Sequence, residues 1–294
     1  MAVVAEDPQK QLEWEARQRP RAGVAAIVAV VAMLGGLIGT VQLGNDVPNP
    51  SGIETFQRAL EPGPVAQLPS LQLPALQYLV DHSAAWLLLG ALGGIGAIAG
   101  GWSMGFLAVA TRARRPELRR WVVYLPIVGG VLAGLAFFLR EVAQLMHAHD
   151  VLDGARTVAQ ATDISGPLIF ASALGFFGQL ATAGGYVLVS LHAMRAGLLT
   201  RLLGTLGIGA GVFTILPILP FGPLLQLLLQ AALALLFFRF WMGGIPPAWE
   251  SGKAEPWPSR QMQVRAAPEP APAPQPAGPG PTAAARRGKR KKRH

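Results

Sequence analysis

The chain of 294 residues contains no cysteine, and only 14% of its residues are charged, whereas 51% are hydrophobic. Without cysteine it can form no disulfide, no thiolate metal site and no thiol nucleophile. Soluble domains carry about 25% charged residues, so the charge content is low for a water-exposed surface. We therefore expect an integral membrane protein.

The motifs that usually mark enzymes and cofactor sites are missing too. No glycine-rich run follows a strand pattern or precedes Lys-Ser or Lys-Thr, which argues against a nucleotide site, and the zinc pattern His-Glu-x-x-His does not occur. No charged side chain lies in the middle of an apolar run, although proton- and ion-coupled carriers usually depend on such groups. We expect no catalytic activity, no cofactor and no metal.

A long uncharged apolar run, residues 84–110, is the segment around which the chain is organised. As a helix its 27 residues measure about 40 Å, enough to cross a hydrocarbon core of about 30 Å. The predicted spans are 22–43, 84–110, 121–139, 166–194, 202–217 and 224–242. The third helix is expected to continue beyond Leu139, because no helix breaker occurs before Gly154. The predicted fold class is all-α, a six-helix transmembrane bundle.

Basic residues are distributed unevenly over the connecting segments. Of the 25 Lys and Arg residues, 22 lie in 1–21, in 112–120, in 195–201 or from Arg239 onward, and the other three are Arg58, Arg140 and Arg156. Lys and Arg accumulate in cytoplasmic connections. We therefore expect a multi-pass protein of the plasma (inner) membrane with both termini in the cytoplasm.

Composition divides the chain into three regions. They are a cytoplasmic N-terminal segment 1–21, a transmembrane domain 22–243 with an external loop 44–82, and a cytoplasmic tail 244–294. In the first region, Glu13 and Glu15 with Arg17 and Arg19 favour a short surface helix. In the third, Trp249 is expected at the inner membrane interface.

The tail is predicted to be disordered, because its Pro/Ala/Gly-rich stretch 266–285 cannot bury a core. It ends in a polybasic cluster formed by Arg286, Arg287, Lys289, Arg290, Lys291, Lys292 and Arg293. Such clusters bind anionic lipid head groups when they lie near a membrane. A solvated tail without a specific partner is the alternative, and a nucleic-acid partner is not expected because no aromatic residues are interleaved.

The external loop 44–82 contains six prolines, which prevent a continuous helix. Two helical turns are expected from Ser51, with Glu54 completing a capping box, while Pro69 and Pro74 are expected to break the apolar stretch 68–80. A protein partner outside the cell would meet this loop.

The second predicted helix is rich in glycine at spacings of four residues. The pairs are Gly90 with Gly94, Gly96 with Gly100, and Gly101 with Gly105. Glycines four apart share a helix face and let two backbones approach closely. We expect packing against several helices of the same chain, with homodimerisation or a pore lining as the alternatives.

Three glutamines, Gln179, Gln226 and Gln230, lie within predicted spans. Amide side chains in a membrane usually form hydrogen bonds between helices. A polar permeation path would use the same residues, so both interpretations stay open.

One external cluster carries groups that can ligate a metal or transfer protons. It comprises Glu141, His147, His149, Asp150, Asp153 and Asp163. His149 and Asp153 share a helical face, but His147 and His149 point apart. An ordinary polar helix end is the preferred interpretation, and for Asp81, His82 and Ser83 it is an N-terminal helix cap.

The stretches SLHAMRAGLLTRLLGTLGIGAG (190–211) and FFRFWMGGIPPAWESGKAEPWPS (237–259) resemble a group of uncharacterised actinobacterial-type membrane proteins. More loosely, residues 22–245 resemble a bacterial six-helix membrane family of unknown function. The resemblance implies a six-helix integral membrane fold and carries no activity.

These features favour an integral membrane protein of unknown activity that is non-catalytic and structural or partner-binding. The alternative is a small transporter or channel with a path near the second helix and the glutamines. A membrane enzyme that uses the His/Asp cluster is a third option.

Overall fold

The computed structural model describes residues 8–49, 51, 53, 72–154, 165–216, 221–242 and 244–255. This described part is helical and contains no strand. Four of its helices are long and apolar enough to cross a membrane: α1 (Pro8–Asn45), α4 (Ser83–Arg114), α5 (Arg120–Leu152) and α6 (Gly166–Ala196). The prediction of an all-helical, membrane-compatible fold is confirmed at this level.

Two further apolar helices are shorter. Helix α7 (Arg201–Ile215) has 15 residues and α8 (Phe221–Phe237) has 17, so they measure about 22 and 26 Å. Two small helices, α3 (Leu73–Asp81) and α9 (Ala248–Ser251), lie at the ends of long ones.

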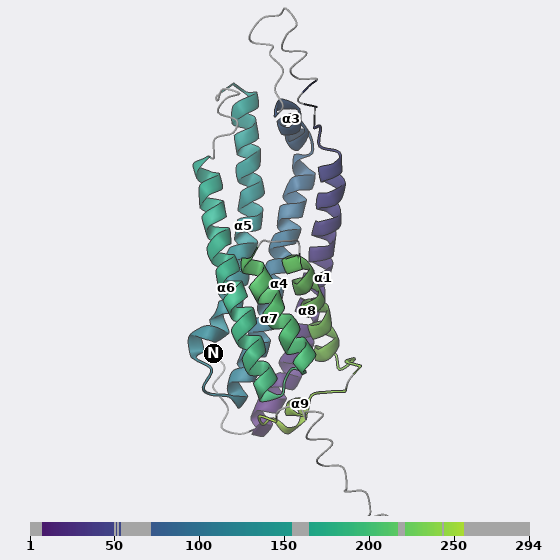
Figure 1. The fold of residues 1–294 in the computed structure, drawn as a ribbon, viewed down its shortest axis with the longest axis vertical. Coiled ribbons are helices and arrows are strands. Elements are labelled where there is room, and N and C mark those ends of the chain that lie inside the picture. The colour runs from purple at the N-terminus through teal and green to yellow at the C-terminus, as the bar shows by residue number, and fades with distance from the viewer. Residues whose placement is uncertain are drawn as a thin grey trace, which may run out of the picture. The chain divides into compact units, whose positions relative to one another are not determined.

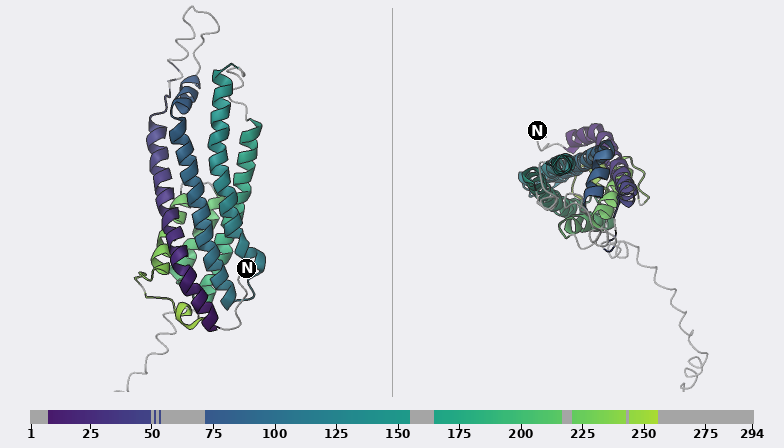
Figure 2. Two further views of the ribbon diagram at one scale, coloured as in Figure 1. Left: turned by 180° about the vertical axis from the view of Figure 1, so that it is seen from behind. Right: turned by 90° about the horizontal axis from the view of Figure 1, so that it is seen from above.

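Within the unit formed by residues 1–257, each helix packs against the next around a ring. Helices α1, α4, α5 and α6 follow one another side by side, and the α7–α8 hairpin connects α6 back to α1 (Figures 1 and 2). The hairpin accompanies only the part of the long helices nearer to α9 (Figure 1). The six-helix part of the bundle is therefore confined to that end.

We call this end the arginine end. It holds the start of α1, the turn between α4 and α5, the turn between α6 and α7, and α9, with Arg19, Arg114, Arg120, Arg195 and Arg201. A cluster of buried apolar residues lies toward it and includes Ala22, Met104, Leu107, Val189 and Leu233.

Local sequence explains the turn at the start of the hairpin. Gly197 adopts φ +78 and ends α6, while Leu198 N–H donates to the carbonyl of Ala193 at 2.9 Å. Thr200 then caps α7, because its hydroxyl accepts from Leu203 N–H at 3.3 Å.

The observed bounds differ from the sequence-based expectations in several places. Helix α1 begins at Pro8 and continues through Pro20, so the polar residues before Ala22 are part of the first long helix rather than a separate surface helix. Helix α5 continues to Leu152, as expected. Helix α8 ends at Phe237, five residues before the predicted end at Met242, because the chain turns at Arg239 with φ +66.

Two predictions for the segment before α4 are wrong, one about Pro74 and one about a helix cap at Asp81. Pro74 lies in the first turn of α3, where its missing N–H costs nothing, so it starts a helix instead of breaking one. Asp81 ends α3, and α4 follows from His82 without a side-chain cap. The apolar stretch after 72 is thus helical up to the start of α4.

The first residues of the predicted tail lie within the described part of the chain. Residues 244–255 pack against the bundle, and Trp249 in α9 is only 2% exposed. They belong to the same compact unit as the long helices.

Candidate functional site

All six glycines singled out in α4 are buried, and they face different neighbours. Toward α5, a Cβ added to Gly94 would lie 2.8 Å from the carbonyl oxygen of Gly134, and one added to Gly101 would lie 2.4 Å from that of Pro126. Gly90 and Gly105 also face α5, Gly96 faces α1, and Gly100 faces α8 and α6. Within this chain, the glycines of α4 thus allow close contact with α5, with α1, and with the pair α6 and α8.

Gln230 lies inside the bundle, only 1% exposed. Its amide oxygen accepts from the hydroxyl of Ser103 at 2.6 Å, and its amide nitrogen donates to the hydroxyl of Tyr186 at 2.9 Å and to the carbonyl of Gly100 at 3.3 Å. This network joins α8 to α4 and α6 at mid-bundle, and the missing side chain of Gly100 makes room for it.

The three glutamines do not come together. Gln226 is half-buried and donates to the hydroxyl of Thr214 on α7 at 2.6 Å. Gln179 is exposed on the surface of α6. Only Gln230 therefore lies in the interior, and it is held by partners on other helices.

The His/Asp cluster is spread along the end of α5. His147 is buried, while His149, Asp150 and Asp153 are exposed. Among the described residues, no group of three His, Asp or Glu side chains is arranged to hold a metal ion. Glu141 packs on Gly90 instead, and Asp163 lies outside the described residues.

Two other predicted sites cannot be placed. The polybasic cluster 286–293 and the stretch 266–285 lie outside the described residues. The same holds for the expected two-turn helix after Ser51 and for most of the external loop.

A charged site that the sequence reading missed lies at the arginine end. The carboxylate of Glu15 forms a two-pronged ion pair with the guanidinium of Arg114, through Oε1 to Nη1 and through Oε2 to Nη2 at 2.9 Å. Both side chains are fully buried. Arg114 also donates to the carbonyl of Ala248 from Nε at 3.0 Å and from Nη2 at 2.7 Å, and Gln11 donates to Glu15 at 2.9 Å.

Trp249 forms the floor beside this ion pair. Its indole N–H donates to the carbonyl of Leu198 at 2.9 Å, and its ring stacks on Phe106 at a centroid distance of 6.0 Å. The guanidinium carbons of Arg19 and Arg114 lie 4.5 and 5.5 Å from the ring centroid, within cation–π range. One tryptophan thus joins α9, α4, α1 and the α6–α7 turn.

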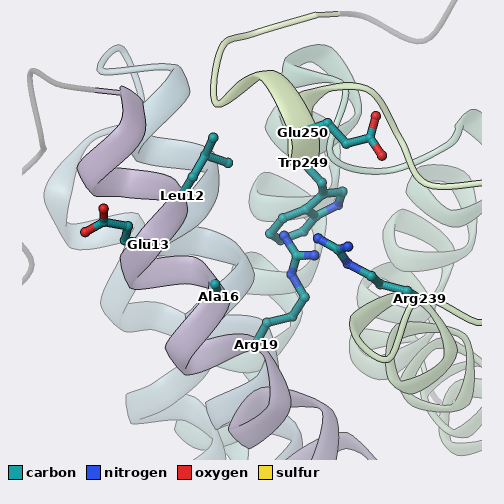
Figure 3. Close-up of a pocket in the computed structure, with 7 residues that line it drawn as sticks. All are labelled: Leu12, Glu13, Ala16, Arg19, Arg239, Trp249 and Glu250. Atoms are coloured by element: carbon teal, nitrogen blue, oxygen red, sulfur yellow. The ribbon is translucent and has the colours of Figure 1, made fainter.

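An open pocket of about 450 Å³ lies over this floor (Figure 3). Its lining consists of Leu12, Glu13, Ala16, Arg19, Arg239, Trp249 and Glu250. In Figure 3 the guanidinium groups of Arg19 and Arg239 lie close to each other beside the indole, whereas the carboxylates of Glu13 and Glu250 point away from them. The pocket therefore presents two cations at its centre.

A periodic signal for this site was present in the sequence. Gln11, Glu15 and Arg19 are four residues apart and continue into Ala22 and Ala26, and all five are buried on α1. Polar residues at helical spacing on the same face as an apolar stripe indicate one continuous buried face. Because residues 1–21 are polar, composition alone predicts a surface segment there.

Comparisons with known protein families, with curated proteins and with solved structures found no match for this chain.

Proposed function

We propose that this chain is a non-catalytic, multi-pass protein of the plasma (inner) membrane that serves a structural or partner-binding role. It crosses the bilayer six times and keeps both termini in the cytoplasm. One observation carries the proposal. Gln230 is hydrogen-bonded inside the bundle, and the helices around it are in close backbone contact.

The four long helices support the membrane assignment, and the hairpin supports an even number of crossings. At about 22 and 26 Å, α7 and α8 are shorter than a hydrocarbon core of about 30 Å, and a short span is accommodated by local thinning of the bilayer. The hairpin returns to the end from which it starts, so the start of α1 and residues 244–255 lie at the same end, which supports placing both termini on one side of the membrane. The excess of Lys and Arg at that end favours the cytoplasm.

The bundle interior supports a packing role over a transport path. A polar path needs side chains that can exchange partners with a solute or water, yet Gln230 uses both ends of its amide within the protein. Gln226 is bonded to Thr214, and Gln179 lies apart from both.

The test combines partner capture with a transport assay. A photo-reactive residue at Arg58, in the external loop, is expected to yield one defined protein adduct in native membranes, with or without residues 260–294. In proteoliposomes, the purified protein is expected to leave permeability to water, glycerol and K⁺ at the level of empty vesicles. Permeability above that level, abolished by Gln230→Leu, would replace this proposal by the transporter alternative.

A further inference from the structure

We propose that the pocket between α1, α9 and the turn after α8 binds a phosphate group, which Arg19 and Arg239 hold over Trp249. The group is either the headgroup phosphate of an anionic lipid or a free phosphate or soluble phosphate ester. The lipid source rests on the membrane orientation proposed above, and the soluble source does not.

Arg19 is a buried cation without an anion of its own. Its side chain is 6% exposed, its Nε has no hydrogen-bond partner, and it forms no ion pair with any described residue. Arginine stays protonated in proteins. A buried guanidinium is costly unless a counter-charge is supplied, so the site is incomplete as the described residues form it.

Glu15 does not supply that charge. Both of its carboxylate oxygens are engaged by Arg114, and Gln11 donates to one of them as well. Arg19 lies before the apolar part of α1, and burial lowers its pKa; Arg239 lowers it further, Glu15 raises it and Arg114 lowers it. Among the described residues, the positive charge of Arg19 is thus only partly compensated.

Arg239 brings a second cation to the same place. Its φ of +66 is unusual for a residue other than glycine, and it is fixed by hydrogen bonds from Arg239 N–H to Leu236 at 3.1 Å and from Phe240 N–H to Leu235 at 2.8 Å. Here the turn directs the guanidinium toward Arg19, although two like charges repel (Figure 3).

Two adjacent guanidinium groups suit a phosphate, because its several oxygens can accept from both groups at once. Each group presents parallel N–H donors, which bind phosphate oxygens in pairs. The Trp249 ring lies 4.5 Å from the guanidinium carbon of Arg19 and supports it by a cation–π contact. With about 450 Å³, the pocket has room for a phosphate and a small ester group.

The location gives both sources access. The pocket opens at the arginine end. Arg19 in its lining lies three residues before Ala22, where the apolar part of α1 begins. A lipid headgroup can enter from the adjacent membrane surface, and a soluble phosphate can enter from water. Glu13 and Glu250 at the rim are exposed and point outward, so they do not neutralise the two arginines.

The test uses the purified full-length protein in phosphatidylcholine nanodiscs, in two arms. The first arm adds phosphatidylglycerol to the nanodiscs and counts retained lipids by native mass spectrometry. The second arm titrates glycerol 3-phosphate and inorganic phosphate and follows binding by calorimetry. Arg19→Gln and Arg239→Gln are compared with Arg17→Gln, which removes the same charge from an exposed position on the same helix.

In one of the two arms, we expect both pocket variants to lose affinity at least tenfold. Arg17→Gln should change the affinity less than twofold. Retained phosphatidylglycerol alone identifies the lipid source, and soluble binding alone identifies the other. Equal losses in all three variants, or no specific binding in either arm, would overturn the proposal. Because Arg239 is exposed, Arg239→Gln keeps the test valid if Arg19→Gln fails to fold.

A wrong membrane orientation would give a different result. In cells, lipids of the inner leaflet would no longer reach the pocket, but both nanodisc arms would still detect binding because both faces of a nanodisc are accessible. Failure of the pocket and failure of the proposed topology are therefore distinguishable.

Discussion

The middle of the bundle and its arginine end are held together by different interactions. At mid-bundle, α4, α5 and α6 touch through glycine backbones, with Gly101 against Pro126 and Gly178 against Ala133. At the arginine end, a buried ion pair, a tryptophan floor and a carbonyl of α9 connect the helices. The first region depends on the absence of side chains, and the second depends on long side chains with fixed partners.

This difference has a physical reason. Lipid tails are as apolar as the side chains they contact, so helices inside a membrane gain from close backbone packing rather than from apolar burial. Near the water interface, long charged side chains can keep partners and still cover apolar surface. The two regions should therefore respond to different substitutions.

The largest effect is expected for Glu15→Gln. It leaves the fully buried Arg114 without its carboxylate, which costs about 3–5 kcal/mol when one partner of a buried ion pair is removed. The thermal unfolding midpoint of the detergent-solubilised protein measures the loss.

Glu13→Gln is the matched control, because Glu13 is exposed and lies two residues away on the same helix. It should leave the midpoint unchanged. Equal shifts in the two variants would mean that the buried pair does not hold the arginine end together.

A second substitution tests the mid-bundle region. In Gly101→Leu, the new side chain begins 2.4 Å from the carbonyl oxygen of Pro126, so α4 and α5 must separate. The expected cost is about 1–3 kcal/mol, as for overpacked cores. Size-exclusion profiles of the solubilised protein should show loss of the single folded species.

Gly36→Leu serves as its control, since a Cβ at Gly36 meets nothing within 4 Å. That variant should behave like the wild type. If both leucines were tolerated, close backbone contact would not be what the glycines of α4 provide.

A smaller effect is expected for Gln230→Leu. It removes the acceptor of Ser103 and the donor to Tyr186, and hydrogen bonds between membrane helices contribute about 1–2 kcal/mol at most. Unfolding in detergent should show a modest decrease in the midpoint, while Gln179→Leu, at an exposed position, should show none.

The last prediction concerns how far the hairpin reaches and involves little change in stability. Because the chain has no cysteine, single cysteines can be added without altering the background. Leu216→Cys, beside the α7–α8 turn, should react with a membrane-impermeant maleimide in intact cells, whereas Glu117→Cys, in the α4–α5 turn, should react only after permeabilisation. Protection of the cysteine at 216 would mean that the hairpin ends inside the membrane.

The sequence predicted the parts of the fold that depend on long uncharged runs. All four long helices were located, the connection after Arg114 was placed correctly, and the continuation of α5 past Leu139 followed from the lack of a breaker. These features depend on local composition, which a linear reading captures.

The arginine end was missed because its residues come from distant parts of the chain. Arg114 contacts Glu15, 99 positions away, and Ala248, 134 positions away. Polarity alone predicts a surface position for Glu15 and Arg19, and the enrichment of tryptophan at membrane interfaces predicts an interface position for Trp249. Likewise, hydropathy did not indicate which of Gln179, Gln226 and Gln230 would face inward.

The bond between Arg114 and the carbonyl of Ala248 has a practical consequence for shortened forms of this protein. Cutting after residue 243, where hydropathy would place the last membrane boundary, deletes an acceptor that receives two hydrogen bonds, together with the indole over which two guanidinium groups lie. A shortened chain that ends after Trp257 keeps these contacts, so α9 is as much a part of the folded bundle as the long helices are.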